Sequence, residues 1–95
     1  MKVKVQYFAR IRELTNQKEE VLDVAEKATV LDILTALSKR HGDKFREYIF
    51  DARTGEPKTY VQFLVNQDSI SNLKGLSTVL TENSILAIIP PVGGG

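Results

Sequence analysis

The stretch "TVLDILTALSKRHG", residues 29–42, determines how the rest of the chain can be arranged. Its apolar side chains recur at i, i+3, i+4 and i+7, which is the pattern of an amphipathic helix. They are Val30, Ile33, Leu34 and Leu37. Thr29 is a favourable N-cap, and Gly42 is expected to end the helix in a left-handed conformation. The sequence therefore predicts a helix with one apolar face that needs another layer to cover it.

The segments before this helix predict a β-hairpin. Residues 2–8, "KVKVQYF", alternate polar and apolar side chains with period two, which is typical of a half-buried strand. Residues 19–24, "EEVLDV", predict a second strand paired with the first. Residues 9–18 between them are polar and irregular, and Asn16 suits a turn. One face of the expected hairpin is apolar and can pack against the helix.

The segments after the helix complete the expected sheet. Residues 43–50 predict a shorter helix and residues 51–57 a loop. Residues 59–65, "TYVQFLV", predict a third strand, Ile70 a short strand, and residues 85–89, "ILAII", the last strand. The order of these elements predicts an α+β fold in which one principal helix packs over a mixed sheet.

Composition excludes several classes of function. The chain of 95 residues is long enough for one small domain with a modest core. It carries 13 basic and 12 acidic residues, so its net charge of +1 favours neither nucleic acid nor an anionic membrane. No apolar run reaches the length of a membrane span, and the N-terminal segment lacks the apolar region of a signal peptide. We therefore expect a soluble, cytoplasmic protein without a membrane or nucleic-acid partner.

The sequence offers no self-contained catalytic or metal site. The absence of cysteine excludes disulfides, a thiolate zinc site and a cysteine nucleophile. His41 is the only histidine, and its place at a helix C-terminus suits a cation that interacts with the helix dipole. Glu19 and Glu20 are adjacent on a strand, so their side chains are expected to face opposite sides.

The last predicted strand is apolar on both faces. Leu86 and Ile88 are expected to point to one face of the sheet and Ile85, Ala87 and Ile89 to the other; a single helix layer covers only one of these faces and leaves an outer face uncovered. Leu64, on a neighbouring predicted strand, is expected to join that outer face. An uncovered apolar patch of this kind is typical of a partner-docking surface.

Two interpretations of this patch remain open at the level of sequence. A partner protein can cover it, in which case Leu64 and Ile89 are the candidate docking residues. Alternatively, the loop at 51–57 or the segment at 71–84 folds over it and leaves no docking surface. Periodicity does not distinguish these possibilities, because it does not place loops.

Residues 90–95, "PPVGGG", predict a flexible tail that follows a domain spanning residues 1–89. Pro90 and Pro91 lack a backbone N–H, so they end the ladder of the last strand and favour an extended exit. The terminal glycines have no Cβ and can enter a narrow channel. A terminal α-carboxylate is ionised at neutral pH and can attack the α-phosphate of ATP in the site of another enzyme. An acyl adenylate results, which a sulfur or amine nucleophile can displace.

Several motifs together resemble those of ubiquitin-like sulfur carriers with the β-grasp fold. The chain most resembles the small subunit of molybdopterin synthase and the archaeal small modifiers. "YFARIREL", residues 7–14, is similar to the family's motif after the first strand, filled here by Phe8, Ala9, Arg12, Glu13 and Leu14. "TVLDIL" is similar to the start of the family helix and "VNQ", residues 65–67, to a strand end and turn. "AIIPPVGGG" is similar to the Pro-Pro-Val-x-Gly-Gly ending, with Gly93 at the variable position.

This resemblance implies a carrier that has no side-chain catalyst of its own. An adenylyltransferase resembling ubiquitin activators would use ATP and magnesium to adenylate Gly95, and sulfur would convert the carboxylate to a thiocarboxylate. The large subunit of molybdopterin synthase would then take the sulfur into the pterin dithiolene that binds molybdenum or tungsten. Gly94 and Gly95 would carry the chemistry and Gly93 would provide clearance. The tail positions implied are Pro90, Pro91, Val92, Gly93, Gly94 and Gly95, with no bound cofactor or metal.

Two other functions remain possible. The chain can be a protein modifier joined through Gly95 to lysines of target proteins, since both routes share the adenylate. It can also be a β-grasp interaction module with an inert tail.

The sequence departs from the family pattern in two places. The turn "TENS", residues 81–84, replaces the family's Asp-Gly-Asp turn, and the segment 43–58 is longer than in the shortest members. A carrier of the thiamine pathway also ends in Gly-Gly, although the motifs "FARIREL" and "PPVGGG" resemble the pterin branch more.

Overall fold

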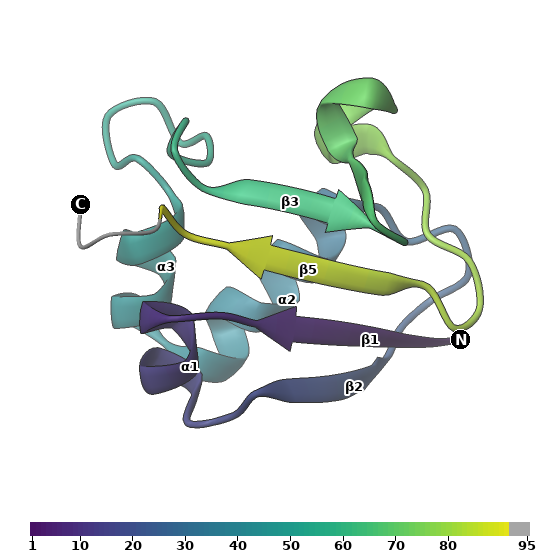
Figure 1. Cartoon of the computed structure of the whole chain (residues 1–95), viewed down its shortest axis with the longest axis horizontal. Coiled ribbons are helices and arrows are strands. Elements are labelled where there is room, and N and C mark those ends of the chain that lie inside the picture. Colours follow the sequence, from purple (N-terminus) through teal and green to yellow (C-terminus); the bar gives the residue numbers. More distant parts are fainter. Residues whose placement is uncertain (92–95) are drawn as a thin grey trace.

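A five-stranded mixed sheet forms the centre of the computed structural model, which describes residues 1–91. The helices α2 and α3 lie against one face of this sheet (Figure 1). The strands and helices, in chain order, are β1 (Lys2–Tyr7), α1 (Arg10–Thr15), β2 (Glu19–Asp23), α2 (Val30–His41), α3 (Asp43–Ile49), β3 (Gln62–Val65), β4 (Asp68–Ser69) and β5 (Ile85–Ile89). Two short 3₁₀ turns, Ile70–Asn72 and Gly75–Ser77, separate β4 from β5. The predicted α+β class and mixed sheet are confirmed.

The strand order is β2-β1-β5-β3-β4. β1 and β5 are parallel, and every other pairing in the sheet is antiparallel. The first and last strands of the chain are therefore central neighbours, and both run toward the same edge of the sheet. Tyr7 of β1 lies beside Ile88 of β5, so the residues that follow them, Phe8 and Ile89, emerge together.

The core forms where the apolar stripe of α2 meets the inner face of the sheet. The four stripe residues predicted from the sequence are completely buried. So are Val3, Val5 and Tyr7 of β1, and Leu86 and Ile88 of β5. This confirms the predicted alternation in both strands and assigns the remaining outward positions of β5 to the opposite face.

α2 begins and ends close to the predicted positions. The hydroxyl of Thr29 accepts a hydrogen bond from the Asp32 N–H at 3.2 Å, and the Asp32 carboxylate accepts one from the Thr29 N–H at 2.9 Å. This capping box satisfies two backbone donors at the helix start. Gly42 ends the helix with φ 90 and ψ −170, so the prediction of a left-handed helical conformation is wrong in ψ. The positive φ still favours glycine.

The structure corrects three sequence-based boundaries. Residues 9–18 were expected to be irregular but contain α1, a helix too short to show a recurring stripe, whose N-terminus has no side-chain cap. β3 begins at Gln62 because the Val61 N–H bonds to the Lys58 carbonyl in a preceding turn. The short strand is β4, whereas Ile70 begins a 3₁₀ turn capped by the Ser69 hydroxyl. Each error concerns a segment too short for periodicity to be informative.

In residues 1–91, no helix combines the length and the apolar character needed to cross a lipid bilayer.

Candidate partner-docking site

Two prolines follow β5 directly and begin the predicted tail. The ladder of β5 ends at Ile89, which pairs with Gln62 of β3. Pro90 is buried and Pro91 half-buried, consistent with residues that stop the strand without a backbone donor. The other predicted tail positions, Val92, Gly93, Gly94 and Gly95, lie outside the described residues. β5, the strand that leads into the tail, is the central strand of the sheet.

A groove of about 380 Å³ lies on the outer face of the sheet, opposite the helices. It contains both residues predicted to dock a partner, Leu64 of β3 and Ile89 of β5. Its complete lining is Gln6, Phe8, Leu64, Asn66, Gln67, Ile85, Ala87 and Ile89. No lining residue comes from 51–57 or 71–84, the two segments that could have covered the patch. We call this feature the outer groove.

Phe8 is the apolar outer-groove residue that sequence analysis did not assign to the docking surface. It has the same parity as Gln6 in the alternation that begins in β1, and this could have placed it on the outer face. The Arg12 guanidinium lies over the Phe8 ring, 5.4 Å from its centroid, and Arg12 Nε donates to the Tyr7 carbonyl at 2.8 Å. Ala9 turns the chain with φ 50. The motif "YFARIREL", residues 7–14, therefore positions an aromatic side chain at the end of the groove nearest the start of the tail.

The opposite end of the outer groove is a tight hairpin turn. Asn66 and Gln67, between β3 and β4, have φ of 48 and 75, the positive values that a type I′ turn requires. The Asn66 N–H donates to the Ile85 carbonyl, and the Asn66 amide oxygen accepts from the Ile85 N–H, both at 2.9 Å. These bonds join the turn to the start of β5. The groove thus has an apolar floor and an ordered, uncharged polar rim, a composition suited to docking a protein surface.

A separate polar network is centred on Glu20, on the inner side of β2. Its carboxylate, 5% exposed, accepts hydrogen bonds from the Tyr7 hydroxyl, from His41 Nε2 at 2.6 Å and from Gln17 Nε2 at 3.2 Å. Arg40 Nε lies 3.1 Å from the same group. The network ties the C-terminal turn of α2 to the β1–β2 hairpin. It confirms that Glu19 and Glu20 face opposite sides, since Glu19 is exposed.

The surroundings of Glu20 control the ionisation of two groups. Burial alone raises the pKa of Glu20, but hydrogen bonds from Tyr7 and His41 outweigh burial and bring the pKa below its usual value. Burial, followed by the hydrogen bond to Glu20, raises the pKa of Tyr7 well above its usual value. His41, assigned from the sequence to the helix dipole, is an interior partner of this carboxylate. The network is structural, because its hydrogen bonds are directed inward among its own members.

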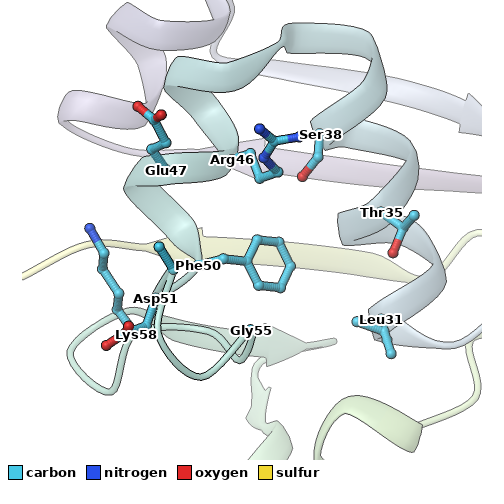
Figure 2. Close-up of a pocket in the computed structure, with 10 residues that line it drawn as sticks. Leu31, Thr35, Ser38, Arg46, Glu47, Phe50, Asp51, Gly55 and Lys58 are labelled. Carbon is cyan, nitrogen blue, oxygen red and sulfur yellow. The ribbon is translucent and has the colours of Figure 1, made fainter.

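A second hollow, of about 630 Å³, lies between α2, α3 and the loop that follows α3. Figure 2 shows the Phe50 ring extending into it, with Leu31 and Thr35 of α2 on the far side. Arg46 and Lys58 contribute positive charge to its lining, and Glu47 and Asp51 negative charge. The charged side chains of its lining therefore sum to no net formal charge.

Among residues 1–91, no group of three or more histidine, aspartate or glutamate side chains could hold a metal ion. The single histidine is committed to Glu20. Within the described residues, the structure places an apolar groove beside the start of the tail.

The fold and this site define a class of protein. A mixed sheet packed on one principal helix, with a central last strand leading to a C-terminal tail, is a ubiquitin-like β-grasp fold. The crystal structure of SAMP1 from Haloferax volcanii has the same fold, with a TM-score of 0.84, 28% identity and full coverage of both chains.

The chain belongs to the ThiS family, whose model matches residues 5–95. It is 33% identical to small archaeal modifier protein 3 of Haloferax volcanii over 95 residues, covering all of both chains. It is 34% identical to the molybdopterin synthase sulfur carrier subunit of Drosophila erecta over 94 residues, covering 98% of this chain and 90% of the relative. The chain is thus related both to a sulfur carrier and to a modifier, and this confirms the resemblance drawn from its motifs.

Proposed function

We propose that the chain is a sulfur carrier for molybdopterin biosynthesis, in which Gly95 is adenylated by a ubiquitin-activator-like enzyme. The observation that carries this proposal is the continuity of β5: its outward residues line the outer groove, and one residue beyond Ile89 the tail begins. Docking at the groove would place the terminal carboxylate within about 20 Å, the reach of six extended residues. The resemblance to a molybdopterin synthase sulfur carrier subunit supports the pathway.

The proposed reaction sequence leaves all catalysis to partner proteins. A Gly95 carboxylate oxygen attacks the α-phosphate of ATP and pyrophosphate departs; hydrosulfide then displaces AMP from the acyl adenylate, which gives the thiocarboxylate and releases a proton. Magnesium and ATP belong to the activating enzyme. The large subunit of molybdopterin synthase then receives the sulfur. This chain contributes the docking groove, the proline exit and the terminal carboxylate.

A second function rests on a separate observation. The chain aligns end to end with small archaeal modifier protein 3 at 33% identity. A modifier would use the same adenylate, but a lysine amine of a target protein would displace AMP and form an isopeptide with Gly95. The carrier and modifier functions differ only in this nucleophile, so one protein can have both.

Intact-mass measurement of the protein isolated from its native cells, with a search for larger conjugates, tests these alternatives. Replacement of one oxygen by sulfur at Gly95 would establish the carrier. Heavier species with Gly95 joined to lysine would establish the modifier. A free carboxylate under all growth conditions would contradict both and favour an interaction module with an inert tail.

Replacing Ile89 with aspartate is expected to weaken binding to the activating enzyme more than about tenfold, because a charge would enter the apolar floor of the groove. The domain should stay folded, since Ile89 is on the outer face and half-buried. Titration calorimetry with the activating enzyme, alongside circular dichroism, would measure both effects. Gln62→Asp is the matched control, because Gln62 pairs with Ile89 on the same face but does not line the groove. Equal affinity of both variants would remove Ile89 from the docking site.

A further inference from the structure

The outer edge of β2 carries a row of backbone hydrogen-bonding groups that have no partner among residues 1–91. β2 is the terminal strand of the sheet, visible below β1 in Figure 1, and among residues 1–91 it pairs only with β1. The Tyr7 N–H bonds to the Lys18 carbonyl, and the Val24 N–H to the Met1 carbonyl. Hydrogen-bonded pairs alternate along an antiparallel ladder, so the backbone N–H and C=O groups of the even-numbered residues of β2 point toward β1. The N–H and C=O groups of Glu19, Val21 and Asp23 therefore point away from the sheet.

The side chains beside these free groups have a defined pattern. Val21 is 54% exposed on the outer face of this strand. Glu19 and Asp23 flank it on the same outer face, with side chains 49% and 78% exposed. The edge thus presents an acidic, an apolar and an acidic side chain at alternate positions. A long edge strand with free backbone groups is a template for pairing with another extended segment.

The charge pattern across the sheet indicates what that segment carries. Lys2 of β1 lies opposite Asp23, and Lys4 Nζ lies 3.3 Å from the Glu19 carboxylate. Basic side chains on β1 therefore alternate with acidic ones on β2, and opposite charges on neighbouring strands stabilise a sheet. Asp23 also lies 3.5 Å from the N-terminal ammonium, so each carboxylate already has one cation on the β1 side. Continuing the alternation favours basic residues on the next strand, opposite Glu19 and Asp23, with an apolar residue opposite Val21.

A second copy of the chain is a poor occupant in the symmetric register. Antiparallel pairing of two β2 strands about Val21 would place Glu19 of each chain opposite Asp23 of the other. Like charges directly opposite each other on neighbouring strands are destabilising. The same two carboxylates that disfavour self-pairing favour a basic partner.

We propose that the β2 edge binds an extended segment of a partner protein with the pattern basic-x-apolar-x-basic, which adds to the sheet as a sixth strand. The main-chain bonds would supply affinity and the two carboxylates specificity. This surface is distinct from the outer groove, because no β2 residue lines that groove. The inference does not depend on the chemistry proposed for the tail.

The test uses the full-length chain and the peptide acetyl-Thr-Lys-Thr-Val-Thr-Lys-Thr-amide. Added at millimolar concentration, it is expected to shift the amide NMR signals of Glu19, Val21 and Asp23 and to slow their hydrogen exchange. The same peptide with glutamate in place of lysine should bind about tenfold more weakly. Affinity for the basic peptide should also fall with added salt.

Two variants keep the test decisive. Val21→Pro removes an edge N–H that the sheet does not use, a position where a strand accepts proline, and should abolish binding. Should this variant misfold, Glu19→Lys combined with Asp23→Lys provides a second test, because it should reverse the preference between the peptides. Glu47→Lys with Glu56→Lys is the matched control, since it changes net charge equally at exposed positions away from β2 and should preserve the preference.

Three results would overturn the proposal. One is the absence of shifts on β2 at millimolar peptide. Another is equal binding of the basic and acidic peptides. The third is concentration-dependent dimerisation of the free chain that Val21→Pro removes, which would assign the edge to a second copy.

Discussion

Deleting Gly94 and Gly95 is expected to lower the rate of AMP transfer to the chain by more than about a hundredfold, since misplacement by even an ångström is costly in a positioned reaction. The deletion withdraws the carboxylate by up to about 7 Å along an extended tail. Binding to the activating enzyme should be nearly unchanged, because every outer-groove residue precedes the deletion. Single-turnover transfer of radiolabelled AMP at saturating enzyme would measure the chemical step apart from docking.

Ile89→Asp is the complementary variant for this experiment. It retains the full tail and should lose affinity, while the truncated chain should retain affinity and lose transfer. A truncated chain that accepts AMP on the new Gly93 carboxylate at the normal rate would disprove the requirement for Gly94 and Gly95. A truncated chain that no longer binds would instead show that the glycines contribute to docking.

Replacing Glu20 with glutamine is expected to destabilise the fold by about 3 kcal/mol, a typical cost of removing one partner from a buried ionic group. The neutral amide removes the charge that pairs with Arg40 and places an N–H₂ group among the Tyr7, Gln17 and His41 donors. One donor or more would lose its acceptor in a site that is 5% exposed. The free energy of unfolding, from urea denaturation monitored by circular dichroism, measures this loss.

Glu19→Gln is the matched control, because Glu19 precedes Glu20 on β2 and is exposed; it should change stability by less than about 0.5 kcal/mol. The pH dependence gives a second readout. The pKa of Glu20 is lowered on folding, so its stabilisation is present above about pH 4.5, its unfolded value, and is lost as pH falls through the folded pKa. Glu20→Gln should flatten this acid branch. Equal effects of the two substitutions would show that the network contributes little.

The helix and the alternating strands were predictable from sequence because their signals are local and long. The apolar stripe of α2 and its Thr29 cap need only neighbours a few residues away, and β1 shows strict alternation. The parity of β5 also predicted correctly which of its side chains share a face. The resemblance then supplied the topology, which periodicity alone does not give.

The Glu20 network was not predictable in the same way. Nothing local marks Glu20 as different from Glu19 except parity, and its partner His41 lies on another element 21 residues away. The groove posed a similar problem. Its lining comes from β1, β3, β5 and a hairpin turn, so only the sheet order shows that Phe8 belongs with Ile89. Features assembled from distant segments need the tertiary structure.

The central pairing of the first and last strands has a consequence for folding. Lys4 and Ile85 are register partners about eighty residues apart in the chain, a non-local contact of the kind that slows folding. Until β5 inserts between β1 and β3, the outer groove does not exist, although the tail is already attached. A partner that must bind the groove before it uses the tail would therefore act only on chains that have completed folding. The topology would in this way exclude unfolded chains as substrates.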